Sequence, residues 1–127
     1  MVNLFKALAD ENRLRILNLL YCSELCVCEI ETLLELTQTN VSRHLGKLRA
    51  VNLIKPFKKA QWAHYQLSSE FKQNELLYAF LQNRFQSEST FLKDTERLHR
   101  YKENELNCSL IRNDKENVLK IIQGEND

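Results

Sequence analysis

Cysteine is the residue type in this chain best suited to chemistry. Cys22, Cys26 and Cys28 fall within seven residues, and Cys108 stands apart near the C-terminus. Thiolates are soft ligands suited to zinc, cadmium, lead and copper(I) and, by the same logic, to trivalent arsenic or antimony. Residues two apart in a helix point about 200° apart, so Cys26 and Cys28 share an ion only where the backbone is extended or drawn out of helix. We therefore expect ion binding to strain or unwind the start of the helix that follows.

Other roles for these cysteines stay open. Cysteine is among the most buried residue types, so Cys22, late in a packed helix, is also a candidate core residue. Neighbouring sulfurs such as Cys26 and Cys28 can also oxidise, which predicts a redox sensor as the alternative. The spacing C-x3-C-x-C lacks the C-x2-C runs typical of iron–sulfur and four-cysteine zinc sites.

The stretch from Thr37 to Ala50 predicts a DNA-recognition helix. Thr37 is suited to cap its first turn, and Val41, Leu45 and Leu48 form one narrow apolar stripe. The opposite arc carries amide, hydroxyl and cationic groups and no acid, as a helix in the major groove requires. The candidates for contact with base edges are Gln38, Thr39, Asn40, Ser42 and Arg43. The candidates for contact with phosphate are Lys47, Lys58 and Lys59.

The charge distribution favours the same face. From Thr37 to Leu67 the chain has six cations and not one Asp or Glu, although the whole protein has a net charge of only +1. A local positive field in a near-neutral protein is typical of a surface that binds a polyanion.

The surrounding elements predict a winged helix-turn-helix. Helices are expected at 2–9, 11–22 and 29–36, ahead of the helix that Thr37 caps. The helix at 29–36 and the helix capped by Thr37 are expected to form a helix-turn-helix. Runs at 53–57 and 61–67 predict a β-hairpin whose tip carries Lys58, Lys59 and Ala60. Pro56 restricts its strand to an edge of the sheet.

A long amphipathic helix is expected over 70–104, capped by Ser68 or Ser69. Its apolar stripe is too long for the small core to cover, which predicts a two-fold dimer. An irregular segment, 105–112, should follow, and then a short helix, 114–123, capped by Asn113 and ended by Gly124. The expected domains are 1–69 for DNA binding, 70–104 for dimerisation and 105–127 as an extension. The fold class is therefore mainly α with a β-hairpin wing and a long C-terminal dimerisation helix.

Composition narrows the class of protein. The 127 residues include only 2 Gly and 1 Pro, which favours helices over an all-β fold. No apolar run approaches the roughly 18 residues of a membrane span, and the charged start is unlike a signal peptide, so we expect a cytoplasmic protein. There is no Gly-rich phosphate loop, no nucleophile with a matched base and no H-E-x-x-H motif. We therefore do not expect an enzyme.

Four segments resemble one known family. LADENRLRIL at Leu8 to Leu17, ELCVCEI at Glu24 to Ile30, TQTNVSRHLGKLR at Thr37 to Arg49 and QWAHYQLS at Gln61 to Ser68 look like the ArsR/SmtB family of metal-sensing repressors. The match covers roughly residues 3 to 70 in order, and ELCVCE followed by SRHL is most similar to the arsenical-resistance branch. The resemblance implies a winged-helix homodimer that binds a roughly palindromic operator and releases it when As(III) or Sb(III) binds Cys26 and Cys28.

One position departs from that branch. Its pattern often has a third cysteine three residues after the second, and Glu31 stands there in this chain. A three-thiolate site would then recruit Cys22 or Cys108, or two thiolates would bind with water. Closing the short loop to Cys22 costs less entropy, whereas Cys108 requires the long helix to carry it to the partner subunit. A sensor of Cd, Pb or Zn is the remaining alternative within the family.

Overall fold

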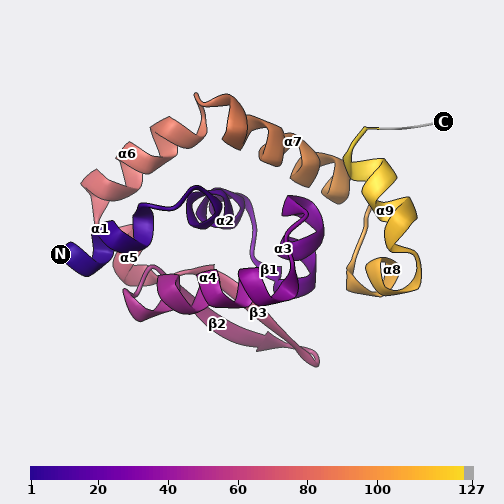
Figure 1. Ribbon diagram of the computed structural model, residues 1–127, viewed down its shortest axis with the longest axis horizontal. Coiled ribbons are helices and arrows are strands. Elements are labelled where there is room, and N and C mark those ends of the chain that lie inside the picture. The colour runs from indigo at the N-terminus through magenta and orange to yellow at the C-terminus, as the bar shows by residue number, and fades with distance from the viewer. Residues whose placement is uncertain (125–127) are drawn as a thin grey trace.

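In a computed structural model that describes residues 1–124, a small winged-helix unit is covered by an arch of C-terminal helices (Figure 1). The N-terminal helices are α1 (Val2–Leu8), α2 (Glu11–Cys22), α3 (Val27–Leu34) and α4 (Gln38–Ala50). The C-terminal helices are α5 (Ser69–Gln73), α6 (Glu75–Phe85), α7 (Ser89–Glu103), α8 (Cys108–Asn113) and α9 (Lys115–Ile122). The strands are β1 (Leu25–Cys26), β2 (Ile54–Lys59) and β3 (Trp62–Leu67). The mainly helical fold with a hairpin wing is confirmed.

The N-terminal helices begin where their capping residues predict. The carboxylate of Asp10 accepts a hydrogen bond from the Arg13 N–H at 3.0 Å, and the Thr37 hydroxyl accepts one from the Asn40 N–H at 3.2 Å. Between them, α3 ends at a left-handed Glu35 (φ 54°), which turns the chain tightly into α4. These local signals make α3 and α4 a helix-turn-helix.

The sheet holds one strand more than the sequence indicated. Its order is β1-β3-β2, so the hairpin pairs on its inner side with the short strand β1. Leu25 lies opposite Tyr65, and Cys26 lies opposite His64. Pro56 is on β2, an edge strand as expected, and Lys58 and Lys59 end that strand instead of forming the turn. A two-residue strand is too short for a periodic signal, so the sequence showed only a connection there.

The expected single helix over 70–104 is wrong as a continuous element. The chain breaks at Asn74, which caps α6, and again between Phe85 and Ser89. At the second break the Ser87 hydroxyl donates to the carbonyl of Asn83 at 2.8 Å, which competes with helix continuation. The bend wraps α6 and α7 around α2 (Figure 1). It brings the ring centroids of Phe85 and Phe91 to 4.8 Å from each other.

The arch therefore packs more of its apolar side chains on the chain's own core than was expected from the apolar stripe of a single helix over 70–104. Leu81, Phe91 and Leu98 are buried in the same cluster as the winged-helix residues. Other apolar side chains of α1, α6 and α7 stay exposed: Val2, Phe5, Leu76, Phe80 and Leu92.

The C-terminal segment folds back along α3 and α7 (Figure 1). The expected irregular stretch 105–112 contains α8, because Asn107 caps it by accepting from the Leu110 N–H at 3.0 Å. The cap of α9 is Asp114 and not Asn113, whereas Gly124 follows the helix with φ 83° as expected. Ile111, Val118 and Ile122 are buried, so both short helices are anchored in the core.

Candidate metal centre and nucleic-acid interface

The start of α3 holds Cys26 and Cys28 in a geometry that differs from the expected one. Cys26 is the residue before the helix and has extended backbone angles (φ −90°, ψ 168°), whereas Cys28 lies in the first turn. Their Sγ atoms are 3.9 Å apart while the helix is fully formed. The extended backbone expected where two such cysteines share an ion is thus present at Cys26, the cap of α3, and unwinding of α3 on ion binding stays a prediction.

Cys108, the first residue of α8, meets this pair from the other end of the chain. Its Sγ lies 2.7 Å from the Sγ of Cys26, and the three sulfur atoms all lie within 4.8 Å of one another. Cys22 is exposed at the end of α2 and lines a different cavity, beside Tyr21. Of the two candidate partners, the structure brings Cys108 to the pair.

The three sulfurs do not have equal acidity. The S–H of Cys28 donates to Cys26 and lowers the pKa of Cys26 to about 7, against the opposing effect of burial. The same hydrogen bond raises the pKa of Cys28, and burial raises the pKa of Cys108 to about 12. One thiolate can therefore form first at Cys26, stabilised by its neighbours' protons.

A buried carboxylate fixes the backbone beneath the sulfurs. Glu29 Oε1 accepts from the N–H of Cys26 at 3.0 Å, and its other oxygen accepts from the Tyr101 hydroxyl of α7. Tyr101 is fully buried, and burial is the main cause that raises its pKa. Neither residue was predicted from the sequence, because a Glu in a first turn and a Tyr in a helix do not indicate that their side chains contact each other.

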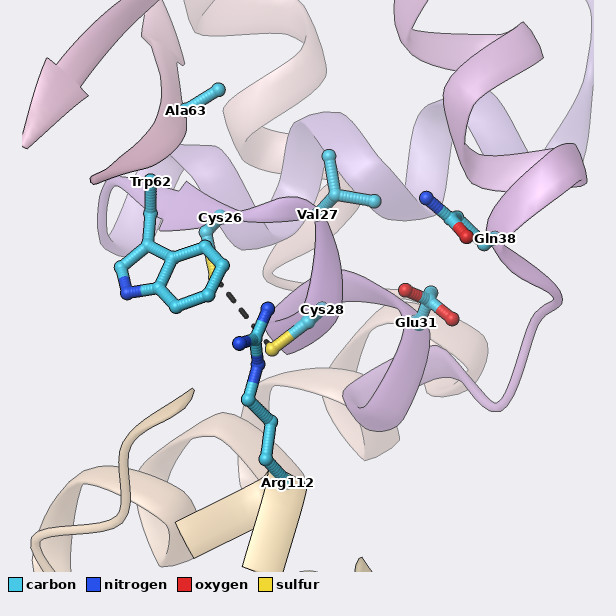
Figure 2. A pocket seen from close by; sticks show the side chains of 8 residues that line it. All are labelled: Cys26, Val27, Cys28, Glu31, Gln38, Trp62, Ala63 and Arg112. Carbon is cyan, nitrogen blue, oxygen red and sulfur yellow. Dashed lines mark hydrogen bonds between the residues drawn. The ribbon is translucent and has the colours of Figure 1, made fainter. Parts of the chain in front are cut away.

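A cavity of about 320 Å³ opens beside the sulfurs (Figure 2). Its walls come from β1 and α3, from the wing through Trp62, from α4 through Gln38 and from α8 through Arg112. The guanidinium carbon of Arg112 lies 3.6 Å from the centre of the Trp62 ring. In Figure 2 this side chain reaches up between the indole and the Cys28 sulfur. The sulfur cluster thus shares a cavity with both elements expected to contact DNA.

The residues expected to bind DNA lie on the outer face of α4 and on the wing. On α4, Asn40 is half-buried, and the exposed members of the set are Gln38, Thr39, Ser42, Arg43 and Lys47. Arg43 donates to the Asn40 side chain at 3.2 Å, which orients both groups. Lys58 and Lys59 are exposed on β2, and Lys59 lies 3.4 Å from Glu24, an exposed ion pair of little energetic weight.

His44 has a structural position on the inner face of α4. Its ring is buried, and Nδ1 lies 3.2 Å from Nη1 of Arg13. Arg13 also donates to the carbonyl of Ala7 at 2.6 Å, so one guanidinium joins α1, α2 and α4. This contact holds the expected recognition helix against the body of the protein.

Known proteins with similar sequences are transcriptional regulators. The profile of the bacterial regulatory protein, arsR family, matches residues 10–55. The arsenical resistance operon repressor of Escherichia coli (strain K12) is 48% identical over 68 residues, which are 53% of this chain and 58% of that protein. The arsenic resistance transcriptional regulator ArsR2 of Pseudomonas putida is 37% identical over 94 residues, which are 72% of this chain and 79% of that protein. The chain belongs to the arsR family.

Structural similarity supports this assignment. HlyU from Vibrio cholerae N16961 matches with a TM-score of 0.54 and 44% sequence identity, over 62% of this chain and 88% of that chain. The arsR family and these relatives are DNA-binding transcriptional regulators and not enzymes. The chain spans little more than half the length of the E. coli repressor. Among the described residues, no helix is both long and apolar enough to cross a membrane.

Proposed function

We propose that this arsR-family protein is a homodimeric repressor that leaves its operator when As(III) or Sb(III) binds Cys26, Cys28 and Cys108. The observation that carries the proposal is the convergence of three sulfur atoms within 4.8 Å of one another. With metal–sulfur bonds of about 2.3 Å, as for zinc, two sulfurs on one ion lie at most about 4.6 Å apart. Small side-chain movements therefore suffice to bring all three sulfurs to one thiophilic ion.

Several features support the DNA-binding half of the proposal. The exposed face of α4 offers amide, hydroxyl and guanidinium groups through Gln38, Asn40 and Arg43. Lys47 on the same helix and the two lysines of the wing add positive charge suited to phosphate. In a dimer, two such helices would enter successive major grooves about 34–36 Å apart, on a roughly palindromic site.

Exposed apolar side chains support the dimer. Phe80 is 61% exposed and Leu76 88% exposed on α6, and Phe5 is 58% exposed on α1. A second copy of the protein can bury these side chains, which the chain's own core leaves uncovered.

The test is a gel shift on the DNA upstream of the protein's own gene. We expect arsenite or antimonite to release the wild-type protein, and Cys26→Ser to stay bound in their presence. Serine is a good helix cap, so this variant keeps α3 while it removes one ligand. Cys22→Ser is the matched control, because Cys22 lies outside the cluster, and it should respond like the wild type. Release of Cys26→Ser at wild-type arsenite concentrations would refute the site. Release by cadmium or zinc alone would reassign the ion.

One contact favours a second candidate function, a thiol redox switch. The sulfurs of Cys26 and Cys108 are 2.7 Å apart, so a two-electron oxidant such as peroxide could join them in a disulfide. In that case peroxide alone would release the DNA and a dithiol would restore binding. Loss of DNA binding on adding arsenite under reducing conditions, with a sulfur-to-arsenic absorption band, would favour the ion sensor instead.

A further inference from the structure

The short helix α8 bears two functional side chains one turn apart. Cys108 and Arg112 are separated by four residues, so they lie on the same face of the helix. Cys108 reaches the sulfur cluster, and Arg112 reaches the wing. Ile111 lies between these two residues in the sequence, and its side chain is buried. It anchors α8 in the core and limits how far Cys108 and Arg112 can move independently.

The wing is contacted on two sides by segments that carry sulfur ligands. Strand β1 ends at Cys26 and pairs with β3 at His64, two residues beyond Trp62. From the other side the Arg112 guanidinium stacks on the Trp62 ring at 3.6 Å. An ion shared by Cys26 and Cys108 would therefore fix α8 relative to the sheet, and with it the position of Arg112 on the wing.

The geometry points to Arg112 as the positioning residue through which ion binding acts on the wing. This inference rests on the proposed function. Ligation of Cys108 holds α8 in place, Arg112 clamps Trp62, and the wing is held in one orientation beside the first turn of α4. Gln38 of α4 lines the same cavity as Arg112, so the stacked Arg112 and the first turn of α4 face one space (Figure 2). The structure shows Arg112 stacked on Trp62; ion binding favours this state, and DNA favours the state in which Arg112 has left Trp62.

Trp62 is the only tryptophan in the chain, so its fluorescence reports directly on this clamp. We expect arsenite to lower the quenching of Trp62 by acrylamide in the full-length wild-type protein. Arg112→Ala and Cys108→Ser should each abolish this change, the first because the stacking partner is absent and the second because α8 is no longer tied to the ion. A direct effect of arsenic on the indole would persist in Arg112→Ala, which separates it from the clamp.

The functional test is the ratio of operator dissociation constants with and without arsenite. Arg112→Ala should reduce this ratio by about 10-fold or more, within the range of allosteric couplings, while arsenite still titrates the three thiols by absorption. Arg112→Lys keeps the charge and loses the planar stack, so it should behave like alanine. Lys120→Ala removes an exposed cation from the neighbouring helix α9 and should leave the ratio unchanged.

The outcomes separate this inference from the proposed function. A wild-type ratio in Arg112→Ala would overturn the role of Arg112 and leave the ion sensor intact. Loss of arsenite titration in Arg112→Ala would make it part of the ion site and would equally overturn the coupling role. If arsenite releases neither variant nor wild type, the proposed function itself fails.

Discussion

The two halves of this chain differ in how far the family profile covers them. Residues 10–67 form the helix-turn-helix and the wing, and the family profile matches residues 10–55 within them. Residues 68–124 form a bent arch and two short helices outside that match. Yet the second half supplies Cys108, Arg112 and Tyr101, all of which lie at or beside the sulfur cluster. The comparison predicts that DNA recognition belongs to the half that the family profile matches, called the conventional half below, and that the sensor is completed by the half outside that match.

The halves are nevertheless joined by polar contacts that fix their relative position. Asp94 of α7 accepts two hydrogen bonds from Arg15 of α2, at 2.7 and 3.0 Å. Arg97 of α7 donates to the carbonyl of Leu33 and to the carboxylate of Glu35 at the end of α3. Such bidentate and charge-assisted bonds hold planar groups in one orientation. A signal arising at α8 can therefore act on a rigid winged helix and not on a loosely tethered one.

The largest effect is expected from removing the candidate ligand that the C-terminal half contributes. We expect Cys108→Ser to weaken arsenite binding by on the order of 100-fold, at least as much as losing an outer-shell partner, because two thiolates and water replace three thiolates. DNA affinity without arsenite should not change, since Cys108 lies in α8, away from the exposed face of α4. Arsenite titration followed by absorption, and by gel shift, measures both.

Cys22→Ser serves as the control, because Cys22 belongs to the conventional half and lies outside the cluster. If Cys22→Ser weakens arsenite binding and Cys108→Ser does not, the sensor lies wholly in the first half. The comparison would then be wrong.

A smaller effect is expected from the bond that joins α7 to the base of the site. Tyr101→Phe leaves one oxygen of the buried Glu29 carboxylate without its donor, which should cost about 1–3 kcal/mol of the free energy of unfolding. Because Glu29 also holds the Cys26 N–H, arsenite affinity should fall by roughly 10-fold. Urea unfolding and arsenite titration give the two quantities.

Tyr21→Phe is matched to it, since the Tyr21 hydroxyl donates to the carbonyl of Tyr78 at 2.9 Å and Tyr21 does not line the cavity beside the sulfur cluster. It should lower stability and spare arsenite affinity. Equal losses of affinity in both variants would show that Tyr101 acts only through general stability.

The same contrast explains what the sequence could predict. Caps, apolar stripes and a hairpin are local signals, so α2, α4 and the wing lie close to where the sequence placed them. Which cysteine joins Cys26 and Cys28 depends on how distant segments pack, and no local pattern encodes it. The cost of loop closure favoured Cys22 over Cys108, but the buried Ile111, Val118 and Ile122 stabilise the return of the chain. The third helix begins at Val27, two residues before the expected Glu29, which places Cys28 in its first turn and leaves Cys26 extended. The proposed division into domains at 69 and 104 remains a prediction about which parts fold independently.

The smallest expected effect lies wholly within the conventional half and depends on pH. Burial, aided by the charges of Arg43, Arg13 and Lys47 and opposed by Asp10, lowers the pKa of His44 below 6.5. The unfolded chain therefore binds a proton at higher pH than the folded one, so stability is fully present above about pH 6.5 and falls as the pH drops toward the lower folded pKa. The slope is at most about 1.4 kcal/mol per pH unit for one such group.

Urea unfolding between pH 7.5 and 5.5 should show this pH dependence of the free energy of unfolding in the wild type and less of it in His44→Gln. His99→Gln, at an exposed site, should keep it. An unchanged slope in His44→Gln would mean that protonation of other groups destabilises the protein in acid. The buried His44 beside Arg13 would then not cause the pH dependence.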